Sequence, residues 1–248
     1  MGESRAKVAL ITGASRGIGR AVAEELARGG ATVVLNYLEK HEQAAAALEG
    51  LRGQSPESVC IQADVRSKEQ VGAMVAQIKE RCGRIDVLVN NAGITRDSFF
   101  HKMTSEHWDA VLDTNLAGVF NVTREVMPGM RDQRSGRVIN ISSIVAFSGN
   151  MGQANYCASK AAVVGFTRAL ALETAALGIT VNAIAPGFMQ TAMLEAVPAK
   201  VQEQVLERIP MRRFGRPCDV AGVVSFLVSP AADYITGQVV HVNGGLYI

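Results

Sequence analysis

The sequence predicts a doubly wound α/β fold, with a seven-stranded, mostly parallel sheet covered by helices on both faces. Short runs rich in valine and isoleucine alternate with longer segments of helical periodicity, and this alternation requires crossover connections between parallel strands. The runs are apolar at almost every position, as expected of strands that are buried on both faces.

The expected strands are residues 8–11, 32–35, 58–61, 85–89, 137–141, 180–184 and 238–242. The expected helices are residues 18–28, 41–52, 68–81, 105–130, 154–177 and 219–228. No proline- or serine-rich linker and no repeat divides the chain, so residues 1–248 are expected to form one domain. Residues 187–216 are too long for a plain connection, so short helices covering a pocket are expected there. The alternative is a peripheral helical pair without a role in binding.

The composition excludes several classes of protein. The 25 lysines and arginines against 23 aspartates and glutamates give a net charge of +2, so no nucleic-acid partner is expected. Hydrophobic residues at 48% and charged residues at 19% exclude a disordered or fibrous chain. No segment is typical of a signal peptide or a membrane span. Four cysteines without a C-x-x-C pair indicate free thiols, no metal site and a cytoplasmic location.

A glycine-rich turn follows the first expected strand and opens the first expected helix. Glycine is required where a strand turns sharply into a helix and where the backbone approaches a pyrophosphate. The N–H groups at the start of the helix then attract the phosphates. A dinucleotide site of the Rossmann type is therefore predicted, with contacts from Gly13, Ser15, Arg16, Gly17, Ile18 and Gly19.

The end of the second strand indicates which dinucleotide binds. Sites for NAD place an acidic residue there to accept hydrogen bonds from the ribose 2′-hydroxyl. This chain has Asn36 and Tyr37 instead, although Glu39 follows closely. A 2′-phosphate would be attracted by the guanidinium of Arg16 in the turn. NADP is therefore predicted, with Asn36 and Tyr37 beside its phosphate.

Tyr156 and Lys160 lie four residues apart in a long expected helix and share one of its faces. A tyrosine hydroxyl has a pKa of about 10 in water, too high for ready proton exchange at neutral pH. A cation held nearby favours the phenolate and lowers that pKa. A surface pair is the commoner reading of this spacing, so the pair alone does not predict catalysis.

Other polar residues follow two further strands. Ser143 comes directly after the fifth strand, and Asn91 to Gly93 follow the fourth. Residues at the carboxyl ends of parallel strands face the ligand crevice of a doubly wound fold. Asn115 lies in the next expected helix. Each residue alone is more typical of a turn or a cap.

Together these motifs resemble the short-chain dehydrogenase/reductase family, and the resemblance covers nearly the whole chain. Within that family the sequence is most similar to reductases of 3-oxoacyl thioesters in fatty acid synthesis and to related ketoreductases. The segments before Tyr156 and around Pro186-Gly187 carry this closer likeness. The matching elements are residues 12–19, Asp64-Val65, residues 90–93, Asn115, Ser143, Tyr156 with Lys160, Pro186-Gly187 and residues 243–245.

The resemblance implies a role for each site residue. Tyr156 would donate a proton to the substrate carbonyl, Ser143 would hydrogen-bond the same oxygen, and Lys160 would hold the nicotinamide ribose and favour the tyrosinate. Asn115 would position a water that links Lys160 to solvent. The remaining cofactor contacts would come from Asp64 and Val65 at the adenine, from Asn91, Ala92 and Gly93 along the cofactor, and from Pro186, Gly187 and Thr191 near the nicotinamide.

The resemblance also implies partners. The substrate would be an acyl thioester carried by an acyl carrier protein, and because such carriers are acidic, a basic rim is expected near the pocket mouth. Arg131, Arg134 and Arg137 are candidates for it, whereas Leu177 stands where carrier-dependent relatives tend to have a basic residue. Acetoacetyl-CoA or a polyketide intermediate therefore remains an alternative substrate.

Two further expectations concern assembly and activity. The resemblance implies a homotetramer, built by packing of the long helices that contain Asn115 and Tyr156 and by the C-terminal strand with residues 246–248. A catalytically silent, NADP-binding subunit is the alternative from another functional class, because fold alone does not fix function. The presence of all four residues expected to be catalytic disfavours it.

Overall fold

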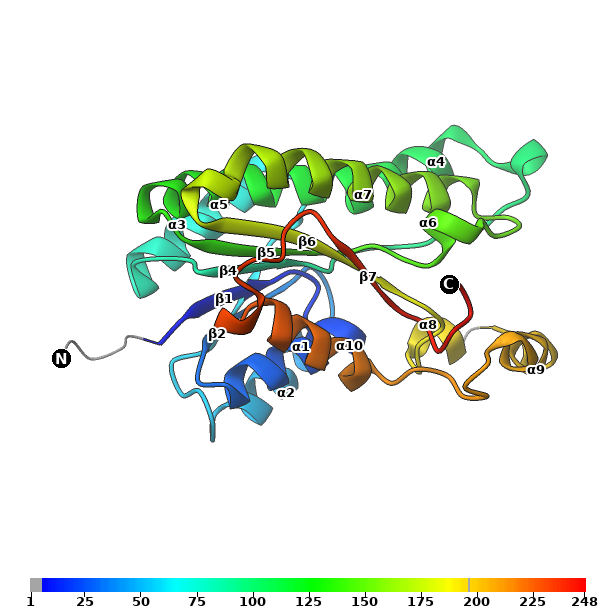
Figure 1. The fold of residues 1–248 in the computed structure, drawn as a ribbon, viewed down its shortest axis with the longest axis horizontal. Coiled ribbons are helices and arrows are strands. Elements are labelled where there is room, and N and C mark those ends of the chain that lie inside the picture. The colour runs from blue at the N-terminus through cyan, green and yellow to red at the C-terminus, as the bar shows by residue number, and fades with distance from the viewer. Residues whose placement is uncertain (1–5, 196) are drawn as a thin grey trace.

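The structure, a computed structural model, describes residues 6–195 and 197–248. Within these residues one sheet contains seven parallel strands in the order β3-β2-β1-β4-β5-β6-β7 (Figure 1). This confirms the predicted fold class. The strand order reverses between β1 and β4, which is where ligands bind in such folds. The strands are β1 (Val8–Ile11), β2 (Thr32–Tyr37), β3 (Val59–Gln62), β4 (Val87–Asn90), β5 (Gly136–Ile141), β6 (Ile179–Pro186) and β7 (Val239–Val242).

Helices cover both faces of the sheet (Figure 1). One layer consists of α1 (Gly17–Arg28), α2 (His41–Leu51) and α10 (Pro217–Leu227), and the other of α3 (Lys68–Cys82), α4 (Ser105–Leu112), α5 (Gly118–Gln133) and α7 (Ala154–Thr174). Alternate residues of each strand face the two layers: Ile11 is buried with α1 and α10, whereas Leu10 is buried with α3 and α5. Each such fully buried side chain contributes roughly 1.5–3 kcal/mol.

Helix α3 shows how the sequence sets these elements. Ser67 caps its start by accepting a hydrogen bond from Gln70 N at 3.2 Å. Val71, with Met74, Val75 and Ile78, forms the buried stripe that a 3.6-residue period predicts. Gly83 ends the helix with a φ of 78°, in the left-handed region that glycine adopts without strain. No helix in the described part of the chain is long and apolar enough to cross a membrane.

The helix predicted at residues 105–130 is interrupted. Between α4 and α5 the chain forms one π-helical turn, η2 (Asp113–Ala117), in which Gly118 N bonds to Asp113 O five residues back. Gly118 permits this turn to approach its neighbour, because a Cβ there would lie 2.7 Å from Val65 Cγ2. A sequence period cannot reveal such a single-turn bulge, and bulges of this kind often occur at functional sites.

The segment at residues 187–216 forms short helices, α8 (Ala192–Glu195) and α9 (Ala199–Arg208). Backbone hydrogen bonds from Gln190 N to Gly215 O and from Gly215 N to Phe188 O close its base. None of the residues of α9 is buried, so this helix lies at the periphery, at the lower right of Figure 1.

A row of buried amides and hydroxyls crosses the sheet beneath its carboxyl edge. Asn90 Nδ2 of β4 donates to Asn140 Oδ1 of β5 at 2.8 Å and to Thr123 Oγ1 of α5 at 2.9 Å. Asn140 Nδ2 donates to Thr167 Oγ1 of α7, also at 2.9 Å. Because each donor would be costly to leave unpaired, the row fixes α5 and α7 against the two central strands.

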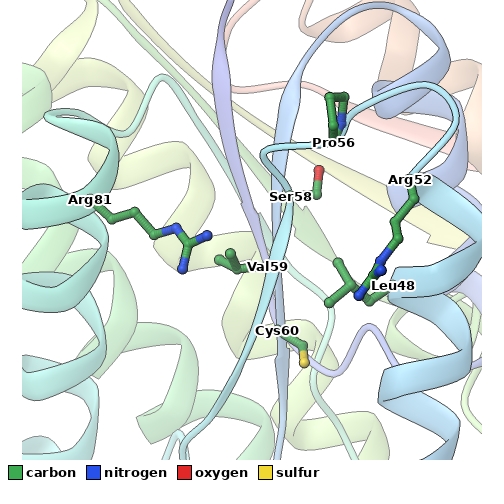
Figure 2. Close-up of a pocket in the computed structure, with 7 residues that line it drawn as sticks. All are labelled: Leu48, Arg52, Pro56, Ser58, Val59, Cys60 and Arg81. Carbon is green, nitrogen blue, oxygen red and sulfur yellow. The ribbon is translucent and has the colours of Figure 1, made fainter.

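The free edge of β3 carries a hollow of about 520 Å³ (Figure 2). Charge and proline protect this edge from pairing with another strand: Arg52 pairs with Glu49 at 3.0 Å, and Pro56 lacks an N–H group. The hollow contains none of the residues predicted to bind or react. It is lined by Leu48, Arg52, Pro56, Ser58, Val59, Cys60 and Arg81.

Two of the helical glycines, Gly19 and Gly72, are expected to respond in opposite ways to alanine. A Cβ at Gly19 in α1 would lie 2.5 Å from Asn91 Nδ2 and 2.7 Å from Gly13 O, so Gly19→Ala should destabilise the fold. A Cβ at Gly72 in α3 meets nothing within 4 Å, so Gly72→Ala should stabilise by up to about 1 kcal/mol. Urea denaturation of both variants checks this, and equal shifts would contradict the close packing at Gly19.

Candidate active site

The predicted residues gather at the carboxyl ends of β1, β4, β5 and β6, on the right side of the sheet in Figure 1. The turn after β1 is fastened to the turn after β4. Thr12 Oγ1 accepts hydrogen bonds from Asn91 N at 2.9 Å and Ala92 N at 3.0 Å, and Asn91 Nδ2 donates to Thr12 O and Gly13 O. Gly13 has a φ of 62°, and a Cβ there would lie 2.9 Å from Ala92 Cα. Only glycine fits this position.

The start of α1 leaves its N–H groups available to an anion. Arg16, the N-cap, has an extended backbone, and its exposed side chain makes no cap hydrogen bond. Gly17 adopts a φ of 57°, and Thr191 lies over it, with Cγ2 3.5 Å from where a Cβ would be. A helix N-terminus with free N–H groups and a bare glycine backbone fits a pyrophosphate. Ser15 and Ile18 flank this cradle, both partly exposed.

The end of β2 differs in detail from what the sequence indicates. Asn36 is buried, and its side chain is already engaged: Oδ1 accepts from Gly13 N at 3.4 Å, and Nδ2 donates to Ala63 O at 3.0 Å. Tyr37 is also buried, and its hydroxyl shares a 2.6 Å hydrogen bond with His41 Nδ1. Asn36 therefore supports the turn, and Arg16 and Lys40 are exposed cations near it, of which Lys40 was not predicted.

Asp64 and Val65 follow β3 in a loop that is held from two sides. Asn121 Nδ2 of α5 donates to Val65 O at 3.0 Å and to Arg66 O at 3.2 Å. The Asp64 carboxylate pairs with Arg66 at 2.6 Å, and this hydrogen bond lowers the pKa of Asp64. Arg66, which the sequence did not single out, therefore competes for the oxygens expected to face an adenine.

Lys160 is 4% exposed and lies in the interior beside β5. Its Nζ donates to Ile141 O at 2.7 Å, and Ser142 Oγ donates to the Lys160 carbonyl at 2.8 Å. Burial lowers the pKa of Lys160 from 10.5 to about 8. The ammonium lies 5.7 Å from the centroid of the Tyr156 ring, which confirms that the two share a face of α7.

Gly93 lies beside both Lys160 and Asn115. A Cβ at Gly93 would stand 3.5 Å from Lys160 Nζ and 3.2 Å from Asn115 Oδ1, so a larger residue there would crowd both groups. Asn115 is fully buried in the π-turn η2. Its Oδ1 accepts from Ile94 N at 2.8 Å, and its Nδ2 donates to Ile94 O at 3.0 Å and to Ser159 Oγ at 3.2 Å. It thereby joins the loop after β4 to α7.

Ser143 lies close enough to Tyr156 for its side chain to favour the ionised phenol and so to lower the pKa of Tyr156. Burial raises the pKa of Tyr156 to about 12, with a further rise from the Asp97 carboxylate, while the Ser143 side chain acts in the opposite direction. Pro186, the last residue of β6, accepts from Ile144 N at 2.9 Å and so aligns the Ser143 loop. Gly187 N donates to Val242 O, also at 2.9 Å. Tyr156 thus lies beside both the Ser143 side chain and the Lys160 ammonium.

The basic rim expected from Arg131, Arg134 and Arg137 is not at this site. Arg137 is at the amino end of β5, and its side chain pairs with Asp233 and donates to Gly178 O. Arg134 follows α5 and donates to Ala176 O. The six residue steps from Arg137 to Ser143 span about 20 Å in extended conformation, so these arginines lie at the amino ends of the strands, opposite to Ser143. The prediction that they line the mouth of their own chain's pocket is wrong.

Two residues near Tyr156 escaped the sequence analysis. Asp97 accepts a 2.8 Å hydrogen bond from Gln153 Nε2, and its charge acts on the Tyr156 hydroxyl. Asn155, directly before Tyr156, is fully buried and donates to Arg96 O and His107 O. The available signal for Asn155 was weak, a polar residue in the first turn of α7 directly before Tyr156.

Comparison with known proteins gives consistent results along the whole chain. A family model described as enoyl-(acyl carrier protein) reductase matches residues 13–247. A 3-oxoacyl-(acyl-carrier-protein) reductase of Staphylococcus aureus is 50% identical over 242 residues, 98% of each chain. The protein of that name from Thermotoga maritima is 48% identical over 244 residues, again 98% of each chain. Nodulation protein G of Azospirillum brasilense is 47% identical over 240 residues, 97% of this chain and 98% of the relative. The chain belongs to the short-chain dehydrogenase/reductase family.

Proposed function

We propose that the protein reduces a 3-oxoacyl thioester, carried by an acyl carrier protein, to the 3-hydroxyacyl thioester with NADPH. The observation that carries the proposal is the convergence of Tyr156, Ser143 and Lys160 beside a glycine turn suited to a dinucleotide. The relatives named 3-oxoacyl-(acyl-carrier-protein) reductase support the substrate class.

The cofactor fits the residues present. The cradle at Gly13 to Gly19 would hold the pyrophosphate, the loop at Asp64 and Val65 the adenine, and Lys160 the nicotinamide ribose. Asn91 to Gly93 and Pro186 to Thr191 would enclose the rest. When bound, NADPH supplies the hydride for the carbonyl carbon.

Tyr156 acts as the proton donor. With a pKa of about 12 it carries its proton at neutral pH, as a donor to a substrate oxygen must. Ser143 can hydrogen-bond the same oxygen and stabilise the negative charge that develops there. The oxygen takes the proton from the Tyr156 hydroxyl, and the ammonium of Lys160 stabilises the resulting tyrosinate. Through the water that Asn115 is expected to position, solvent returns the proton to Tyr156.

Two observations bear on the preference for a carrier protein over coenzyme A. The arginines expected at the mouth lie at the amino ends of the strands, which removes one reason to prefer a carrier protein over coenzyme A. Identity of 48–50% with carrier-protein reductases across 98% of the chain favours the carrier. Turnover of acetoacetyl groups on acyl carrier protein and on coenzyme A decides between them, with faster turnover expected on the carrier.

The proposed assembly is a homotetramer. Phe120 on α5 and Leu172 on α7 are 43% and 87% exposed, and Ile248 at the C-terminus is fully exposed. Exposed apolar side chains on these elements are what packing against further copies of the chain would cover.

Tyr156→Phe is expected to lower kcat by at least about 100-fold, because it removes the proton donor while keeping the ring. Its affinity for NADPH, measured by the change in nicotinamide fluorescence, should stay close to that of the wild type. Tyr234→Phe is the control, because Tyr234 is fully exposed. Full turnover by Tyr156→Phe would refute the role assigned to the phenol, and an inactive wild type would refute the proposed reaction.

The rate of reduction is expected to fall as the pH rises through about 8. Above that pH Lys160 loses its proton, and with it the attraction for the developing tyrosinate.

The effect of Lys160 on stability depends on pH in the opposite direction. Because its pKa is lower in the folded than in the unfolded chain, the unfolded chain binds more protons between about pH 8 and 10.5, so stability gains with pH there. Measurements of kcat/KM and of the denaturation midpoint against pH check the two predictions. A rate of reduction that still rises at pH 9 contradicts the role of the Lys160 charge.

Arg16→Ala is expected to lower kcat/KM for NADPH roughly tenfold and to leave that for NADH unchanged, because only NADPH carries the 2′-phosphate. Arg20→Ala is a matched control: it removes an arginine one turn further along α1 that pairs with Glu24 at 2.8 Å. Steady-state kinetics with both cofactors checks the difference. Equal losses for NADPH and NADH in Arg16→Ala would count against the phosphate contact.

A further inference from the structure

We infer that Asn155 is a positioning residue for Tyr156, and that it acts together with Ser159 as a clamp between α7 and the loop after β4. The inference rests on the proposed function, since it concerns where the reacting phenol is held. The two residues are called the Asn155–Ser159 clamp below.

Asn155 forms the first rung of the clamp. It is fully buried, and each of its side-chain polar atoms is engaged. Nδ2 donates to Arg96 O at 3.0 Å and to His107 O at 3.1 Å, while Oδ1 accepts from the N–H of Tyr156 at 2.8 Å. One amide therefore links the backbone of the proton donor to the loop after β4 and to α4.

Ser159 forms the second rung, one turn further along α7. It is also fully buried. Its Oγ donates to the Tyr156 carbonyl at 2.8 Å and accepts from Asn115 Nδ2 at 3.2 Å. Asn115 in turn holds both backbone groups of Ile94. The N–H and the C=O of Tyr156 are thus each bonded to one rung.

The helix period explains why this arrangement controls the phenol. Asn155 and Ser159 are four residues apart and share one face of α7, and Tyr156 and Lys160 share the face about 100° away. Fixing the first face against residues 94–96 therefore fixes the rotation of α7 about its axis. That rotation sets where the Tyr156 hydroxyl points relative to Ser143, which comes from a different strand.

Two further hydrogen bonds join the start of α7 and the residues before it to the loop after β4, and we call this whole contact between residues 94–98 and 152–159 the seam. Ser98 N donates to Gly152 O at 2.8 Å, and Gln153 Nε2 donates to Asp97 Oδ2 at 2.8 Å. These groups are more exposed than the clamp, and water can replace such contacts at lower cost. The buried rungs, which water cannot replace, are the contacts that set the geometry.

The experiment compares Asn155→Ala with Asn182→Ala. Asn182 is a matched control: it is fully buried in β6, its Nδ2 donates to Ile235 O at 2.8 Å, and its Oδ1 accepts from Gln238 N at 3.0 Å. Both variants lose a buried amide that bonds to backbone, but Asn182 lies outside the seam. Each is assayed for kcat and KM with NADPH and an acetoacetyl thioester, for NADPH affinity, for the denaturation midpoint and for the pH profile of kcat.

We expect both variants to lose thermal stability, but only Asn155→Ala to lose about 100-fold in kcat, because a displacement near 1 Å at the reacting group costs that much. Its NADPH affinity should be retained, and the pH profile of kcat should shift because the Tyr156 environment changes. Asn155→Ser, which keeps one donor and one acceptor, should recover part of the rate. A kcat loss in Asn182→Ala as large as in Asn155→Ala would overturn the inference, as would an Asn155→Ala enzyme with wild-type kcat.

Ser159→Ala keeps the test open if Asn155→Ala does not fold. It removes the second rung with a residue that favours helix, and a selective loss of kcat with a shifted pH profile is expected again. Wild-type kcat in this variant would overturn the clamp. These outcomes are distinct from failure of the proposed function, in which the wild-type protein itself would not oxidise NADPH with the thioester.

Discussion

The burial of one ammonium is the constraint on which the site depends. Lys160 lies inside the protein with a pKa lowered to about 8, and Ile141 O accepts a hydrogen bond from its Nζ. Charge is held in such a position only at a cost in stability, of about 1.4 kcal/mol for each unit by which the pKa is lowered. In the proposed mechanism this charge stabilises the tyrosinate of Tyr156, whose own pKa burial raises to about 12.

The surrounding structure keeps this cation and the phenol in place. Gly93 leaves room for the ammonium, and Asn115 and Asn155 fasten the helix that carries both groups to the loop after β4. The row from Asn90 to Thr167 does the same one layer deeper. These supports are buried amides and hydroxyls bonded to backbone groups or to one another, which is a rigid kind of contact because no water can take its place.

The sequence predicts the fold and the composition of the site because both depend on short patterns of neighbouring residues. Apolar runs gave the strands, and the glycines gave the turn that Gly13 requires with its φ of 62°. Features that depend on contacts between distant segments could not be predicted from such patterns. The π-turn at Asn115 has no periodic signature. The side chain of Asn36 is bonded to residues that follow β1 and β3, and Arg137 is near Ser143 in sequence but lies at the opposite end of β5.

Asn155 is an example of a residue whose contacts only the tertiary structure reveals. Next to Tyr156 in sequence, it gives only a weak signal, since a polar residue in the first turn of a helix most often caps or faces solvent. Its meaning comes from Arg96 and His107, which are 59 and 48 positions away. A reactive residue can be recognised in a sequence by the chemistry of its own side chain, whereas a positioning residue can be recognised only from its contacts in the structure. Residues of the second kind are therefore the ones that a structure adds to a family resemblance.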